Sequence, residues 1–124
     1  MKKLTSILAS MALTLMVGSS IVFAAGDDFW VENYGSSLIN GSSYVGYSGY
    51  TEGGGSDLSR VRVYSYFYAN GSLLDTDYDN DVSYASVDYT VDSENVFSAE
   101  IKSSHYAYNI ANDKDTRTST DYWD

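Results

Sequence analysis

The chain has 124 residues, no cysteine, no proline and a formal net charge of −10. A surface this acidic repels nucleic-acid phosphates and anionic lipid headgroups, so neither nucleic-acid binding nor direct membrane binding is expected. The lack of cysteine excludes a disulfide framework, so packing and sheet hydrogen bonds must stabilise the fold.

Residues 1–24 have the features of a secretory signal peptide. A cationic Lys2-Lys3 head precedes a mostly apolar run, and Val22-Phe23-Ala24 supplies small residues at the cleavage positions. An uncleaved anchor is the alternative, because about 20 apolar residues can span a bilayer. We expect cleavage, with a mature start at Ala25 and release into the medium. Export without disulfides favours a Gram-positive bacterium as the source.

Residues 25–57 form a segment rich in glycine, serine and tyrosine. Phe29-Trp30-Val31 is a short apolar run that suits a first edge strand. The aromatic content of Tyr44–Thr51 favours a weak strand, with a flexible segment as the alternative. The glycine triplet within Thr51–Asp57 has no periodicity, which predicts a loop.

Residues 58–124 form the main part of a single domain, and Val61–Tyr68 is their strongest strand because it is dense in β-branched and aromatic residues. Asn70-Gly71 tolerates the positive φ angles of a tight hairpin turn, after which Ser72–Thr76 can return antiparallel. Alternation assigns one face of the first strand to the core, namely Val61, Val63, Ser65 and Phe67. The other face carries Arg62, Tyr64, Tyr66 and Tyr68.

Two further strands, Val82–Val91 and Val96–Tyr108, are expected to pair through the acidic loop Asp92–Asn95 and to complete a β-meander. In the last strand the alternation slips near Ser103-Ser104, which predicts a β-bulge. The residues after Asn112 are polar. The core-facing side of the first of these two strands is predicted to hold Ala85, Val87, Tyr89 and Val91.

No stretch of the chain after the apolar leader shows helical periodicity. The sequence therefore predicts an all-β fold, an antiparallel β-sandwich or small barrel of about six strands, preceded by a cleaved signal peptide.

Enzymatic chemistry is not expected. His105 is the only histidine and there is no cysteine, so neither an activated nucleophile nor a zinc centre has its residues. Acidic residues are abundant, but abundance does not place two carboxylates across a substrate. We expect His105 to be a strand residue with a hydrogen-bonded ring.

Four aromatic residues are candidates for a binding surface: Tyr64, Tyr66, Tyr68 and Trp123. Three tyrosines on one strand face can form a strip on which sugars or peptides stack, unless a second layer of the fold covers them. Trp123 either joins this surface or caps a sheet edge. The partner is expected to be an extracellular glycan, a cell wall or a protein.

An acidic row, Asp75, Asp77, Asp79 and Asp81, has carboxylates at every second position. An EF-hand is excluded, because Val82 stands where that loop requires glycine. Two alternatives stay open. The row is either a solvated acidic turn, or a loop that wraps a hard cation, for which calcium is the better guess because it tolerates irregular coordination. No other cofactor is expected.

Small size, the export signal, the lack of cysteine and the tyrosine-rich β pattern resemble the small secreted bacteriocins of the lactococcin 972 type. The acidic charge departs from the cationic character expected of proteins that act on bacterial envelopes. The first functional hypothesis is therefore a secreted, non-enzymatic protein that binds or interacts at the cell surface or in the medium. The alternative is a secreted antagonistic protein of the bacteriocin kind.

Overall fold

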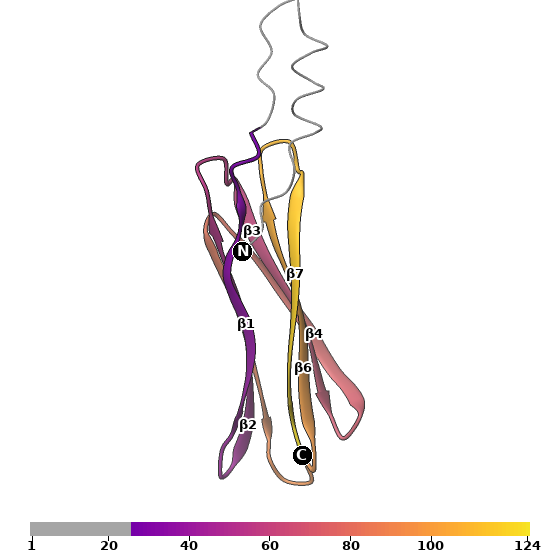
Figure 1. Cartoon of the computed structure of the whole chain (residues 1–124). Helices are drawn as coiled ribbons and strands as arrows, with labels where there is room; N and C mark the ends of the chain where they lie inside the picture. The colour runs from indigo at the N-terminus through magenta and orange to yellow at the C-terminus, as the bar shows by residue number, and fades with distance from the viewer. Residues whose placement is uncertain (1–25) are drawn as a thin grey trace, which may run out of the picture.

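The computed structural model describes residues 26–124, which form two antiparallel sheets packed face to face (Figure 1). The predicted signal peptide at residues 1–24 lies outside this range. Within residues 26–124, no helix has the length and apolar character that crossing a membrane requires.

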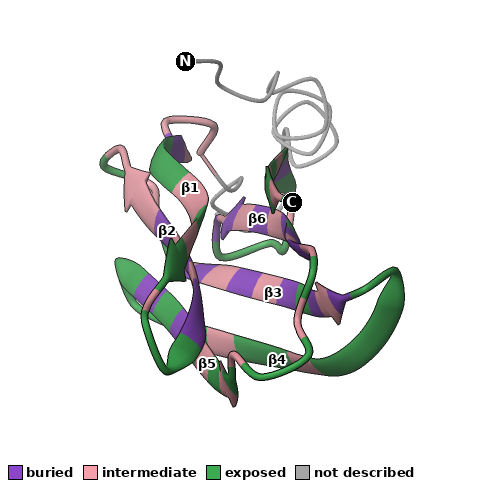
Figure 2. Ribbon diagram, turned by 90° about the horizontal axis from the view of Figure 1, so that it is seen from below, coloured by how far each residue is buried: buried purple, intermediate pink, exposed green. Residues whose placement is uncertain are grey.

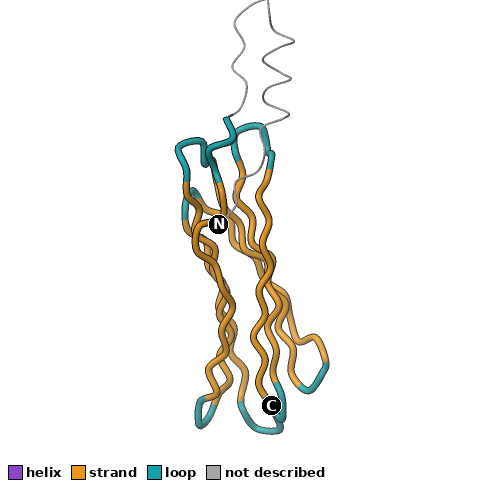
Figure 3. The backbone as a smooth tube through the Cα atoms, in the orientation of Figure 1, coloured by secondary structure: helices purple, strands orange, loops and turns teal. Residues whose placement is uncertain are grey.

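Seven long strands make up the two sheets, where about six were expected (Figure 3). The antiparallel two-sheet architecture itself is confirmed. The three-stranded sheet has the order β1 (Trp30–Asn40), β2 (Tyr44–Gly54), β5 (Tyr84–Asp92). The four-stranded sheet has the order β4 (Ser72–Asp81), β3 (Arg60–Ala69), β6 (Ala99–Tyr108), β7 (Lys114–Trp123).

The core lies between the two sheets. The side of β3 that faces it is the one that the alternation of residues predicted. Val61, Val63, Ser65 and Phe67 are fully buried, and β3 shows the resulting alternation of buried and less buried residues in Figure 2. The ring of Phe67 stacks on Tyr89 of β5, with centroids 4.8 Å apart and the planes almost parallel. This contact joins the two sheets near the end of β3 that leads into the Asn70-Gly71 turn.

The β3–β4 hairpin turns at Asn70-Gly71, as predicted. Both residues have positive φ, 53° and 79°, and Ala69 pairs directly with Ser72. β4 then continues beyond the expected end at Thr76 as far as Asp81. The acidic stretch predicted to be a loop is therefore the second half of an edge strand.

The predicted pairing of the two strands that follow is wrong. β5 pairs with β2 in the three-stranded sheet, while β6 returns to pair with β3 and β7. The connection between β5 and β6 thus crosses from one sheet to the other. The alternation of apolar and polar residues identifies the buried face of a strand, but it does not identify the strand that pairs with it.

The predicted β-bulge in β6 is also wrong, because its register with β3 runs without a shift from Tyr108 to Ala99. Ser103 and His105 stay on the inner face and are buried there. The larger side chains in this half of β6 therefore lie on the outer face without any shift in register. The inner face carries hydrogen-bonding side chains in place of apolar ones. Phe97 lies before β6 and is 75% exposed.

Two regions form strands where the sequence indicated loop or tail. β2 extends through Gly54, past the predicted loop boundary at Thr51. Gly53 is required there, since a Cβ atom would lie 2.6 Å from Cγ1 of Val61. β7 occupies most of the polar C-terminal stretch.

Side chains join the two sheets along both open sides of the sandwich. On one side, the β7 residues Asp115 and Asp121 accept hydrogen bonds from the backbone N–H groups of Val31 and Leu38 on β1, at 2.9 and 3.0 Å. On the other side, Asp79 of β4 accepts from the N–H of Ser86 on β5 at 3.0 Å. Aspartates thus bond backbone groups that a sheet edge would leave unpaired.

Candidate ligand-binding face

The outer face of the four-stranded sheet, which we call the tyrosine face, points away from the three-stranded sheet. Strand alternation directs every second residue of β3, β6 and β7 to this side. Cross-strand pairing then brings tyrosines from all four strands together. They are Tyr64, Tyr66, Tyr68, Tyr78, Tyr106, Tyr108 and Tyr122.

The rings of the tyrosine face support one another. Tyr64 stacks on Tyr78 of the neighbouring strand, with centroids 6.0 Å apart and planes 9° apart, and its ring lies 5.2 Å from that of Tyr66. Tyr106 and Tyr108 stack at 6.0 Å. Tyr66 nevertheless keeps 38% of its surface exposed. The result is an ordered aromatic platform that is accessible from outside.

Basic side chains lie over these rings. The guanidinium of Arg60 is 3.7 Å from the centroid of Tyr108, and that of Arg62 is 4.8 Å from the centroid of Tyr78. The ammonium groups of Lys102 and Lys114 lie 5.4 Å from the rings of Tyr68 and Tyr106. A cation held over a ring face is attracted by its quadrupole, which fixes these long side chains on the surface.

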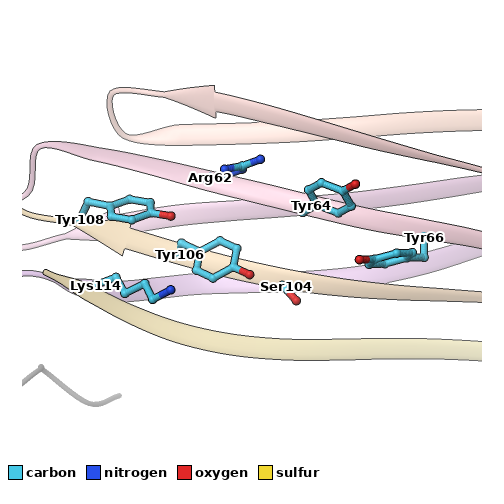
Figure 4. A pocket seen from close by; sticks show the side chains of 7 residues that line it. All are labelled: Arg62, Tyr64, Tyr66, Ser104, Tyr106, Tyr108 and Lys114. Atoms are coloured by element: carbon cyan, nitrogen blue, oxygen red, sulfur yellow. The ribbon is translucent and has the colours of Figure 1, made fainter. Parts of the chain in front are cut away.

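A groove of about 370 Å³ is sunk into the tyrosine face (Figure 4). Ser104 sits directly opposite Tyr64 in the register, and its small side chain leaves the hollow between larger neighbours. The hydroxyl groups of Tyr66 and Tyr106 point toward each other across Ser104 (Figure 4). The groove is lined by Arg62, Tyr64, Tyr66, Ser104, Tyr106, Tyr108 and Lys114.

The structure brings some of the sequence candidates together and separates others. Tyr64 and Tyr66 line the groove, whereas Tyr68 lines a smaller hollow beside Tyr122. Trp123 is on the opposite side of β7, opposite Ala99, and packs against the core. Trp123 is therefore not part of the tyrosine face.

The sequence reasoning missed the β6 and β7 residues of the groove. The β-bulge expected near Ser103-Ser104 would have turned Tyr106 and Tyr108 toward the inner face. An unbroken alternation from Ile101 would have assigned both to the outer face. Lys114 had no signal of its own, because its strand was not recognised.

The acidic row lies along the edge strand β4, on the same side as its inward-facing partners in β3, and Asp75, Asp77 and Asp81 are exposed there. Asp75, Asp77 and Asp81 each accept a hydrogen bond from the next residue's N–H, at 2.7–2.8 Å. Asp79 instead reaches β5. Among residues 26–124, no three His, Cys, Asp or Glu side chains gather as a metal site would require. Calcium binding by this row stays a prediction.

A buried polar network crosses the interior below the tyrosine face. His105 bonds Thr51 through Nδ1 at 2.8 Å and Ser119 through Nε2 at 2.7 Å. The chain continues from Ser119 to Ser36 at 2.6 Å and from Ser36 to Ser103 at 2.7 Å. The expectation of a hydrogen-bonded strand histidine is confirmed. The network links both sheets through groups that would otherwise be buried without partners.

Burial lowers the pKa of His105 from 6.5 to about 4, and a hydrogen bond with the backbone of Tyr50 offsets only part of this effect. The unfolded chain therefore binds a proton more readily than the folded one. The stability that this neutral ring contributes is complete above about pH 6.5 and is lost as the pH falls to about 4, a change on the order of 3 kcal/mol.

We expect urea titrations of the wild type to show this loss, and His105→Gln to reduce the pH dependence over the same interval. The substitution leaves every carboxylate in place, so the difference between the two curves isolates the histidine. Parallel curves would show that His105 keeps its ordinary pKa in the fold.

The chain matches no protein-family model, and no curated protein is significantly similar to it in sequence.

Proposed function

We propose that this protein is a non-enzymatic extracellular binding protein and that the tyrosine face holds carbohydrate. The observation that carries this proposal is the stacked array of tyrosines from adjacent strands around a polar groove. Each phenol ring offers a flat apolar surface for the C–H face of a sugar. Its hydroxyl can at the same time exchange hydrogen bonds with the sugar hydroxyls.

Preorganisation supports a binding role. The rings stand on strands in fixed register and are held by stacking and by cations. Little side-chain freedom is therefore left to lose when a ligand binds, which favours affinity. The groove volume of about 370 Å³ lies at the lower end of the range for small-ligand sites, which suits one or two sugar units.

The groove also favours carbohydrate over a protein partner. A stable protein interface needs an apolar centre surrounded by a polar rim. The lining here alternates ring faces with hydroxyl, guanidinium and ammonium groups. That mixture matches the alternation of C–H and O–H groups on a sugar.

The test is a pull-down on insoluble bacterial cell wall and on a panel of immobilised polysaccharides. Tyr64→Ala with Tyr106→Ala is expected to weaken binding about tenfold or more, equivalent to about 1.4 kcal/mol. Tyr44→Ala with Tyr84→Ala is the matched control, because both residues are exposed on the outer face of the other sheet. Equal loss in both double variants would contradict the proposal, and growth inhibition of neighbouring bacteria would point to the antagonistic alternative.

A further inference from the structure

Charge is segregated on this molecule. The sequence has 17 acidic residues against seven basic ones. Yet the tyrosine face carries four of the five basic residues in residues 26–124, namely Arg60, Arg62, Lys102 and Lys114. Among the strand residues directed to this face, Glu100 is the only acid. A strongly acidic protein thus presents one locally basic surface.

Within residues 26–124, these four cations form no ion pair. The ion pair of Arg117 with Asp115 lies on the opposite side of β7, at the junction with β1. The four basic residues of the tyrosine face instead lie over aromatic rings. A ring attracts a cation without neutralising it, so the positive charge stays available to a ligand.

Two of the four, Arg62 and Lys114, line the groove itself. Nε of Arg62 is buried and has no hydrogen-bond partner among the described residues. Buried N–H groups are almost always paired, so Arg62 keeps a hydrogen-bond donor that no other group in residues 26–124 uses. A guanidinium fits carboxylate and phosphate oxygens with two parallel hydrogen bonds, and an ammonium adds a point charge.

We propose that the groove selects an anionic polysaccharide, a chain of sugars that carries carboxylate or phosphate groups. The proposal rests on the carbohydrate-binding function above and adds the charge of the ligand. Tyr64 and Tyr106 hold the sugar rings, Arg62 and Lys114 bind the acidic group, and the Ser104 hydroxyl bonds from the floor. The net negative charge of the whole protein disfavours more densely charged polymers such as nucleic acids.

The test uses two matched pairs of soluble polysaccharides in calorimetric titrations at one fixed ionic strength. The first pair is polygalacturonate and its methyl ester, which differ in the carboxylate. The second is phosphomannan and the same mannan after removal of phosphate. We expect the wild type to bind the anionic member of at least one pair ten or more times more tightly than its neutral counterpart, and the responding pair identifies the acid.

Arg62→Gln with Lys114→Gln is expected to remove this preference while weak binding to the neutral member remains. Lys102→Gln is the matched control, because it removes a cation from the same face outside the groove and should keep the preference. Thermal unfolding of each variant verifies that the fold is intact.

The outcomes separate this inference from the proposed function. Equal affinity for both members of each pair would overturn anion selection and leave carbohydrate binding standing. Binding to none of the four polysaccharides would overturn both. Single-stranded DNA or polyglutamate binding as tightly as the anionic polysaccharide would show a general anion surface and overturn selection of a sugar chain.

Discussion

Replacing Phe67 with alanine is expected to lower the free energy of unfolding by about 3–5 kcal/mol. The side chain is fully buried between the two sheets. It stacks on Tyr89 at 4.8 Å and meets Tyr47 edge-on at 5.5 Å, so its removal costs burial and leaves a cavity between the sheets. Strands in fixed register on both sides limit how far that cavity can collapse.

Urea unfolding monitored by tyrosine fluorescence measures this change. Tyr66→Ala is the matched control, since it truncates the neighbouring aromatic residue on the exposed face and should cost much less. If the Tyr66 variant were the less stable of the two, the assignment of inner and outer faces in β3 would be reversed.

Replacing Asp115 with alanine is expected to cost a similar amount, about 3–5 kcal/mol, as is typical when one partner of a buried ion pair is removed. The carboxylate is almost completely buried. It accepts one hydrogen bond from the backbone N–H of Val31 at 2.9 Å and one from Arg117 at 2.8 Å. Alanine would leave both donors without this acceptor.

Asp75→Ala is the control for Asp115→Ala, because Asp75 is exposed and bonds only the next residue's N–H. Its effect should stay within about 0.5 kcal/mol, as for ordinary surface substitutions. Equal melting temperatures for the two variants would mean that the β1–β7 contact contributes nothing to stability.

The sequence was most informative where one strand face is apolar and the other is not. Val61, Val63 and Phe67 alternate with Arg62 and tyrosines, and this period-two pattern predicted the buried face of β3 correctly. The Asn70-Gly71 turn was equally predictable, since few residue pairs accept positive φ twice in succession. Local rules suffice when the burial and the turn are both encoded within one hairpin.

The sequence failed where polar side chains face inward. β7 directs Asp115, Ser119 and Asp121 toward β1, and these residues bond a backbone or a buried network. No hydrophobic alternation marks such a strand, because its partners come from residues more than 80 positions earlier. Ser103 and His105 also face inward although they are polar, so the hydrophobic pattern of β6 did not reveal which of its faces is buried.

The candidate site was predictable only in part. The β3 tyrosines Tyr64 and Tyr66 were found from the pattern of their own strand. The groove itself depends on Ser104 being opposite Tyr64, and on Lys114 arriving from the chain's last strand. Such placements follow from strand order, which alternation leaves undetermined.

The acidic row of β4 has a consequence for how copies of this protein meet. A sheet edge with free N–H and C=O groups is a template on which a second chain can add a strand, and this chain has no proline to prevent it. β4 is an edge strand, Asp75, Asp77, Asp79 and Asp81 lie along it, and two of these carboxylates already accept hydrogen bonds from its N–H groups. Two copies joined edge to edge would bring both rows of carboxylates together. Their mutual repulsion would oppose the edge-to-edge pairing from which continuous aggregated sheets grow.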